Sequence, residues 1–260
     1  MTVKVTTVGL YKKLYRIAAE KKLWLRVLGE VDRYPIWYIR NQDGYTNRPR
    51  LLIVAGFHGE ERAGPIALMQ WLETFDPNLY KKVNLSFIPI INPVGFNKNQ
   101  RYNDKEEKNN CGFCHPESGD RPSEEGIILL KNSQLLKGSS KHGFLSLHED
   151  IPAKKFYLYT FEREAEPTLF THTLRDVLGS FFQEPLHGET VTTDADGGKG
   201  VLVQDGIVYK LCDGSFEDWL FHEGTIRAAV TETPGTYPLK VRVDANMTLI
   251  STFINLCGSA

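Results

Sequence analysis

Short apolar runs alternate with polar stretches along most of the chain, and their composition predicts strands. The runs are rich in β-branched and aromatic residues and are bounded by Gly, Pro, Asn or Asp, as buried strands usually are. Apolar residues at helical spacing follow several of them. The predicted strands cover residues 24–30, 34–39, 51–55, 83–91, 143–148, 155–161 and 225–233, and the predicted helices include 10–17, 68–75, a segment from Ser123 onward, 174–181, 215–221 and 250–257.

The alternation of strands and helices predicts an α/β fold, in which a central mixed β-sheet carries helices on both faces. We expect a single domain over residues 1–260, and we expect the first three strands to pair antiparallel at its start. Two polar segments, 97–122 and 187–206, interrupt the alternation. Loops of this length in a compact domain are usually functional, so we expect both to shape a pocket.

Composition and charge argue against several classes of function but do not indicate a particular one. The 260 residues carry a net charge of −1, which gives no reason to expect nucleic acid or an anionic membrane as a partner. The sequence contains no apolar run long enough to span a bilayer, and residues 1–7 lack the apolar core of a signal peptide. Four cysteines in this context suggest reduced thiols and a cytoplasmic protein, while the oligomeric state stays open.

Ligand-type side chains stand at the ends of three predicted strands. His58 and Glu61 follow the strand at 51–55, His148 ends the strand at 143–148, and Glu232 lies near the end of the strand at 225–233. In open α/β sheets, ligands bind in the turns after such strands. Two His and one Glu form a three-ligand zinc set with an open position, and a further Glu can act as the base of a hydrolase.

At these residues the chain resembles the zinc carboxypeptidase family over roughly residues 51–237. The family's H-x-x-E matches His58 and Glu61, its third ligand matches His148, and its general base matches Glu232 in Val230-Thr231-Glu232-Thr233-Pro234. The Asn-Pro-x-Gly-Phe signature matches residues 92–96, and the Arg that polarises the scissile carbonyl matches Arg101. The resemblance implies Zn²⁺ as cofactor and a peptide or an acylated amino acid as substrate.

The resemblance also implies substrate-binding residues, with one departure. The family's mobile Tyr matches Tyr209, which lies ahead of Gly214-Ser215-Phe216-Glu217-Asp218-Trp219, although Tyr237 is a rival. Peptidases of the family read the terminal carboxylate with an adjacent Asn-Arg pair. Asn110 can stand for the Asn, but Cys111 replaces the Arg, so a bidentate guanidinium contact is missing there.

Spacing and cysteines leave alternatives open. His148 follows Glu61 by 87 positions, a compact layout similar to the succinylglutamate desuccinylase and aspartoacylase branch, although only 28 residues follow Glu232 where those enzymes carry a C-terminal β domain. We therefore expect a zinc metallocarboxypeptidase; the alternatives are an N-acyl amino acid deacylase and a non-catalytic zinc-binding or redox module. Residues 111–115 fit C-x-x-C-H, which could be a haem attachment site, a redox pair or a metal clip, but two unrelated thiols are favoured.

Overall fold

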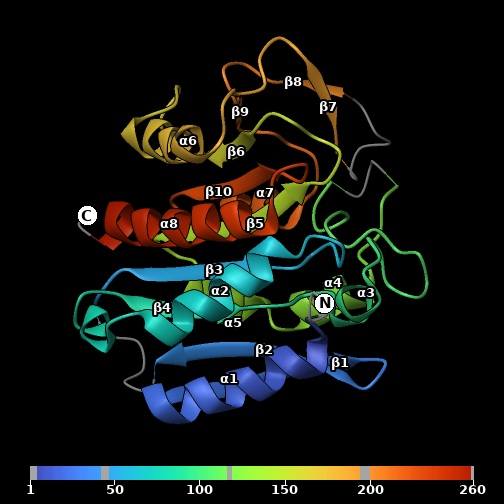
Figure 1. Cartoon of the computed structure of the whole chain (residues 1–260), viewed down its shortest axis with the longest axis vertical. Coiled ribbons are helices and arrows are strands. Elements are labelled where there is room, and N and C mark those ends of the chain that lie inside the picture. Colours follow the sequence, from blue (N-terminus) through green and yellow to red (C-terminus); the bar gives the residue numbers. More distant parts are fainter. Residues whose placement is uncertain (1–4, 42–46, 116–118, 194–199, 259–260) are drawn as a thin grey trace.

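The computed structural model describes residues 5–41, 47–115, 119–193 and 200–258. Figure 1 shows helices stacked across one long twisted sheet. In chain order the elements are α1 (Thr7–Lys21), β1 (Leu23–Val31), β2 (Tyr34–Asn41), β3 (Arg50–Ala55), α2 (Ala63–Thr74), a 3₁₀ turn (Pro77–Lys81), β4 (Asn84–Ile88), α3 (Pro93–Lys98), α4 (Glu124–Lys131), α5 (Ser133–Ser139), β5 (Gly143–Asp150), β6 (Tyr157–Phe161), α6 (Leu169–Phe181), β7 (Thr190–Thr192), β8 (Gly200–Leu202), β9 (Ile207–Tyr209), α7 (Phe216–His222), β10 (Ala228–Pro234) and α8 (Leu239–Gly258).

Eight of the strands form one mixed sheet in the order β1-β2-β4-β3-β5-β10-β6-β9. Its centre is parallel, because β3 pairs in parallel with β4 and β5, and β5 with β10. The expected mixed α/β sheet is therefore confirmed. The expected antiparallel start is wrong in one respect: β1 and β2 are antiparallel, but β4 lies between β2 and β3. The uninterrupted apolar run of β3 fits a central parallel strand covered on both sides.

Side chains alternate between two hydrophobic layers along the central strands. In β3, Leu51 and Ile53 pack into the layer formed with α1, α2, α6 and α8, whereas Leu52 and Val54 pack into the layer with α4, α5 and α7. Figure 1 shows α1, α2, α6 and α8 lying along the sheet. This period of two decides which strand-end residues share a face, because successive side chains point to opposite sides.

The second polar segment contains more regular structure than the sequence predicts. Segment 187–206 holds β7 and β8, which form a separate two-stranded antiparallel sheet, although residues 194–199 lie outside the described part. Short α5 and β9 were not predicted either. Among the described helices, none combines the length and apolarity needed to cross a membrane.

Candidate metal centre and active site

The turn after β3 places His58 and Glu61 just beyond the carboxyl end of this central strand. Gly56 has φ +71°, which lets the chain leave the strand sharply, and α2 begins at Ala63, two residues after Glu61. Gly59 has no room for a side chain, since a Cβ there would lie 2.0 Å from the backbone carbon of Gly95. The turn is therefore packed directly against α3, and its shape is fixed by backbone contact.

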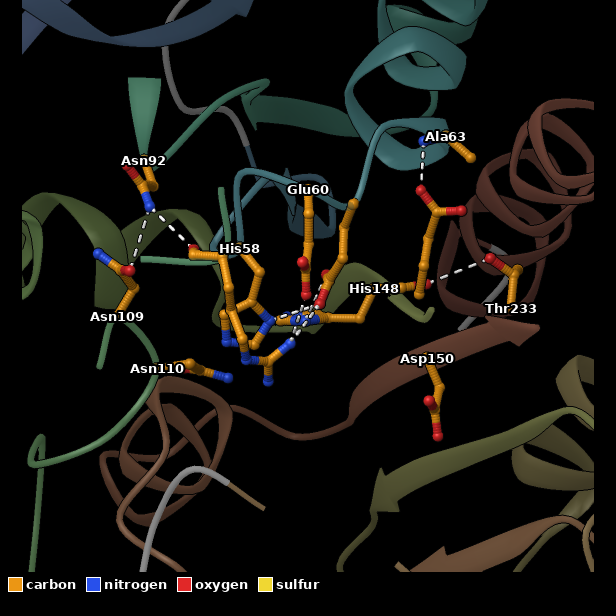
Figure 2. Close-up of polar contacts among 12 residues, drawn as sticks. His58, Glu60, Ala63, Asn92, Asn109, Asn110, His148, Asp150 and Thr233 are labelled. Carbon is orange, nitrogen blue, oxygen red and sulfur yellow. Dashed lines mark hydrogen bonds and ion pairs between the residues drawn. The ribbon is translucent and has the colours of Figure 1, made fainter. Parts of the chain in front are cut away.

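The side chains of His58 and His148 point toward one another (Figure 2), and the Glu61 carboxylate lies between them. Nδ1 of His58 lies 2.5 Å from Oε1 of Glu61, and Nδ1 of His148 lies 3.0 Å from Oε2 of the same carboxylate. One donor atom from each residue lies within 4.8 Å of the others, and all three residues are buried. The sequence-predicted ligand set is thus brought together from two neighbouring strands, β3 and β5.

The donor set fits a divalent metal. Oε2 of Glu61 is buried and accepts no aligned hydrogen bond from the described residues, although it faces an imidazole nitrogen. An orphaned buried carboxylate oxygen between two imidazoles is costly without a cation to bind it. Two nitrogens and one oxygen are also the ligands that catalytic zinc sites use, with a fourth position left for substrate or water.

Strand alternation places Glu232 beside this triad and Glu149 away from it. His148 and Glu232 are register neighbours on the parallel strands β5 and β10, so both point to the layer of α4, α5 and α7. Glu149 points the other way. Its Oε1 accepts a hydrogen bond from the backbone N–H of Ala63 at 2.5 Å, and its Oε2 pairs with Arg242 of α8. Glu149 therefore anchors the start of α2, next to Glu61, and does not orient a ligand directly.

The Asn-Pro-x-Gly-Phe segment holds the Arg101 loop against the metal centre. The Asn92 side chain caps α3 by accepting from Gly95 N–H at 2.8 Å and donates to the carbonyl of Arg101 at 3.2 Å. The same carbonyl accepts from the N–H of Gly59 at 3.1 Å. As a result, Nη1 of Arg101 lies 3.4 Å from Glu60 and 3.5 Å from Glu61. Arg101 therefore lies beside the candidate metal ligands, and its catalytic role stays a prediction.

A cavity of about 490 Å³ opens over the triad and includes residues from both polar segments. Arg101 and Asn110 come from the first, and Thr190 to Thr193 from the second. The cavity is also lined by Tyr157, Tyr159, Asp213 and Glu217, which the sequence patterns did not identify as site residues. The two tyrosines could have been found by extending the period-two alternation along β6, whereas the two acids depend on the packing of α7. The described lining residues are His58, Glu60, Glu61, Arg101, Asn110, His148, Glu149, Asp150, Ile151, Pro152, Tyr157, Tyr159, Phe161, Thr190, Val191, Thr192, Thr193, Leu211, Asp213, Ser215, Glu217, Val230 and Glu232.

Asn110 lines the cavity, but its amide is engaged by α7. Its Nδ2 lies 3.2 Å from both carboxylate oxygens of Glu217, and its Oδ1 accepts from the N–H of Phe216 at 3.0 Å. Cys111, in the place of the family's Arg, is buried and directs its thiol to the carbonyl of Lys108. Asn110 therefore positions one wall of the cavity.

Tyr209 does not reach the cavity in this structure. It ends β9, the edge strand, and its hydroxyl donates to the carbonyls of Glu164 at 2.9 Å and Glu166 at 3.0 Å. Its rival, Tyr237, packs on Phe182 and accepts from the N–H of Gln183. Neither Tyr209 nor Tyr237 is among the described residues that line the cavity, so a substrate-binding role for Tyr209 stays a prediction.

Burial and mutual contact set the ionisation of the centre. Burial opposes the charge on Glu61, but His58 and His148 outweigh it and lower the Glu61 pKa to about 2. Burial likewise opposes a charged His148, yet the facing Glu61 carboxylate raises its pKa. Glu232 differs: burial, reinforced by the Glu61 and Asp150 carboxylates, raises its pKa well above the ordinary range despite His148 and Arg101.

Comparison with known proteins places the chain in a family. A family model described as the succinylglutamate desuccinylase/aspartoacylase catalytic domain matches residues 47–154. A solved candidate metallopeptidase from Shewanella amazonensis is 36% identical, with a TM-score of 0.88 over 96% of this chain and 92% of that one. A similar protein from Shewanella denitrificans is 34% identical, with a TM-score of 0.88, over 97% and 91%. No curated protein sequence gives a significant match.

More distant structures share the fold alone. A metallo-carboxypeptidase from Burkholderia cenocepacia is 12% identical, with a TM-score of 0.66 over 97% of this chain and 68% of that one. Bovine thrombin-activatable fibrinolysis inhibitor, solved with a tick carboxypeptidase inhibitor, is 11% identical, with a TM-score of 0.67 over 98% and 97%. The two Shewanella proteins, at 36% and 34% identity over nearly the whole chain, instead show that the chain belongs to a metallopeptidase family of hydrolases, and the family-model match lies in the succinylglutamate desuccinylase and aspartoacylase branch.

Proposed function

We propose that the protein is a zinc-dependent amide hydrolase, and specifically a metallocarboxypeptidase acting on peptides. The observation that carries the proposal is the convergence of His58, Glu61 and His148 under an open cavity, with Glu232 on the same face of the sheet. Zinc held by the triad would supply the Lewis acid that activates a water molecule and a carbonyl. The absence of disulfides among the four cysteines supports the proposed cytoplasmic setting.

Other residues of the cavity transfer the proton, stabilise the oxyanion and position these groups. Glu232, on the same face of the sheet as His148, takes the proton of the attacking water and delivers it to the leaving amine. Arg101 carries the cationic charge next to the triad and stabilises the oxyanion that develops on the scissile carbonyl. The Asn92 contact holds the Arg101 loop in place, so part of the catalytic geometry depends on backbone hydrogen bonds remote from the substrate.

The charge of the cavity narrows the substrate class. Among its described lining residues, Arg101 is the one Lys or Arg side chain, against seven carboxylates. Four of these have roles already: Glu60 pairs with Arg101, Glu61 faces the histidines, Glu149 anchors α2 and Glu232 is the proposed base. The carboxylates left over are Asp150, Asp213 and Glu217.

Asp213 and Glu217 line the wall beside Asn110, where the family's peptidases bind a carboxylate. Burial raises the pKa of Glu217 to about 7 and that of Asp213 to about 6, so both carboxylates lack full solvation. A cationic group on the substrate would compensate them, whereas a second anion would not. We therefore propose peptides that present an amino or guanidino group to this wall.

The family-model match over residues 47–154 favours a second candidate, an N-acyl amino acid deacylase. Such an enzyme shares the metal ligands and the base. Acidic acyl amino acids such as a succinylglutamate carry several carboxylates, which would meet Asp150, Asp213 and Glu217 in this cavity. Like charges at short range disfavour that substrate, so the charge pattern supports the peptidase.

Glu232→Gln tests the base. Glutamine keeps the size of the side chain but cannot accept the proton, so we expect kcat on peptides to fall by about 10²- to 10⁴-fold. Zinc content, measured by mass spectrometry of the metal, should be unchanged. Glu20→Gln, an exposed residue of α1, is the matched control and should retain full activity. A Glu232→Gln variant with wild-type kcat would remove Glu232 from its role.

His148→Ala tests the metal ligand set. Removing one of three ligands should abolish stoichiometric zinc at this centre and, with it, the hydrolysis of peptides. Circular dichroism should show a retained fold, since the substitution leaves the β5 ladder intact. Full zinc occupancy at the centre in this variant would show that the triad does not hold the ion.

Glu217→Gln tests the charge preference of the cavity. We expect the ratio of kcat/KM for a peptide ending in lysine to that for a matched peptide ending in leucine to fall about tenfold or more, equivalent to ~1.4 kcal/mol. The leucine peptide should be hydrolysed at close to the wild-type rate. An unchanged ratio would show that Glu217 does not read substrate charge.

A further inference from the structure

A second cluster of metal-ligating side chains lies beside the cavity wall, formed by two segments far apart in the sequence. The residues around Cys114 and His115 pack against the segment that runs from Cys212 to His222. The N–H of Phe113 donates to the carbonyl of Gly214 at 2.9 Å, and Phe113 packs on Phe216 with ring centroids 5.1 Å apart. Gly214 has φ +81°, and a Cβ there would lie 2.9 Å from the Cys114 carbonyl oxygen. The two segments are therefore fitted closely to each other.

Four donor atoms meet where these segments touch. His115, Cys212, Asp218 and His222 each place one ligand atom within 4.8 Å of the other three. Nε2 of His115 lies 3.1 Å from Oδ2 of Asp218, Nε2 of His222 lies 3.2 Å from Oδ1, and Sγ of Cys212 lies 3.7 Å from Nε2 of His222. A tetrahedral zinc ion, with bonds of about 2.0–2.3 Å, keeps neighbouring ligand atoms about 3.3–3.8 Å apart.

The Asp218 carboxylate points to a cation at this position. Its side chain is 1% exposed, and Oδ2 accepts from the N–H groups of Asp213 at 3.0 Å and Gly214 at 2.9 Å. Oδ1 is buried and accepts no hydrogen bond from the described residues, although His222 lies beside it. The two oxygens of this buried carboxylate each face one imidazole, and the Cys212 thiol lies within 4.8 Å. Carboxylate, imidazole and thiolate are the donor types that zinc takes in proteins.

The charge of the cluster balances with one Zn²⁺. Asp218 supplies one negative charge, and Cys212 supplies a second when its thiol loses a proton on binding. His115 and His222 bind as neutral imidazoles. His222 and Cys212 are exposed, so an ion can reach the cluster from solvent. Cys114 Sγ lies 3.5 Å from Oδ2 of Asp218 and borders the site, whereas Cys111 is buried and directs its thiol to the carbonyl of Lys108.

We propose that His115, Cys212, Asp218 and His222 form a second zinc site, separate from the catalytic triad and structural in role. The site joins the segment that carries Asn110 to the helix that carries Glu217. Those two side chains contact each other at 3.2 Å and form one wall of the cavity. An ion bound by residues of both segments restricts the motion of each segment relative to the other. Metal binding therefore stabilises the cavity wall that faces the substrate.

The test is a metal count on the full chain, purified with zinc and dialysed against buffer without a strong chelator. We expect two zinc ions per chain in the wild type and one in the Cys212→Ser/His222→Ala double variant. His148→Ala should also retain one, and combining it with the double variant should leave none. His172→Ala, an exposed histidine of α6 outside both clusters, is the matched control and should retain two.

Cobalt substitution gives a readout that does not depend on catalysis. Thiolate-to-cobalt charge-transfer absorption should be present in the wild type and in His148→Ala, because the catalytic triad contains no sulfur, and absent in Cys212→Ser. Cys114→Ser should keep the absorption. A wild type with one zinc and no charge-transfer band would overturn the second site, and loss of the band in Cys114→Ser would overturn Asp218 as the fourth ligand.

Discussion

The Glu61 carboxylate, held between the Nδ1 atoms of His58 and His148, is the interaction on which the rest of the site depends. A carboxylate buried to 1% exposure loses most of its hydration and needs opposite charge close by. The two imidazoles that face it come from two adjacent parallel strands, β3 and β5, whose carboxyl ends lie side by side, and together the three side chains could hold a cation. The backbone of Gly95 packs directly against Gly59, so the turn that carries His58 and Glu61 has no room for a side chain at that position. Glu149 and Arg242 hold the start of α2 from the opposite side.

The period-two alternation of strands separates two functions that are adjacent in sequence. His148 and Asp150 face the cavity, whereas Glu149 faces α2 and α8. The same rule puts Glu232 of β10 beside His148. One strand thus supplies a candidate metal ligand on one face and a structural ion pair on the other. A shift of β5 by one residue would exchange these faces, so the register of the parallel centre is as important to the site as the identity of its residues.

Local sequence patterns predicted much of this arrangement. The apolar runs identified the central strands, and ligand-type residues at their ends identified His58, Glu61, His148 and Glu232 as one constellation. The pairing order was not predictable, because nothing in β2 or β3 shows that β4 lies between them. Tyr209 followed a linear match, but its place is set by β9 pairing at the sheet edge. The cluster around Asp218 combines side chains about a hundred positions apart in sequence, so only tertiary packing reveals it. Tertiary packing likewise places Asp213 and Glu217 in the cavity lining, which their sequence positions do not predict.

The most direct test of the proposed function is a digest of a mixed substrate pool, read by mass spectrometry. The pool would contain peptides with free C-termini, including matched lysine and leucine ends, together with N-acyl amino acids. Chelator-treated protein, with and without added zinc, would be compared on the same pool. The account predicts zinc-dependent release of single C-terminal residues, fastest from peptides that present a cationic group. Zinc-dependent release of amino acids from the acylated compounds alone, or no zinc-dependent product from any of them, would contradict it.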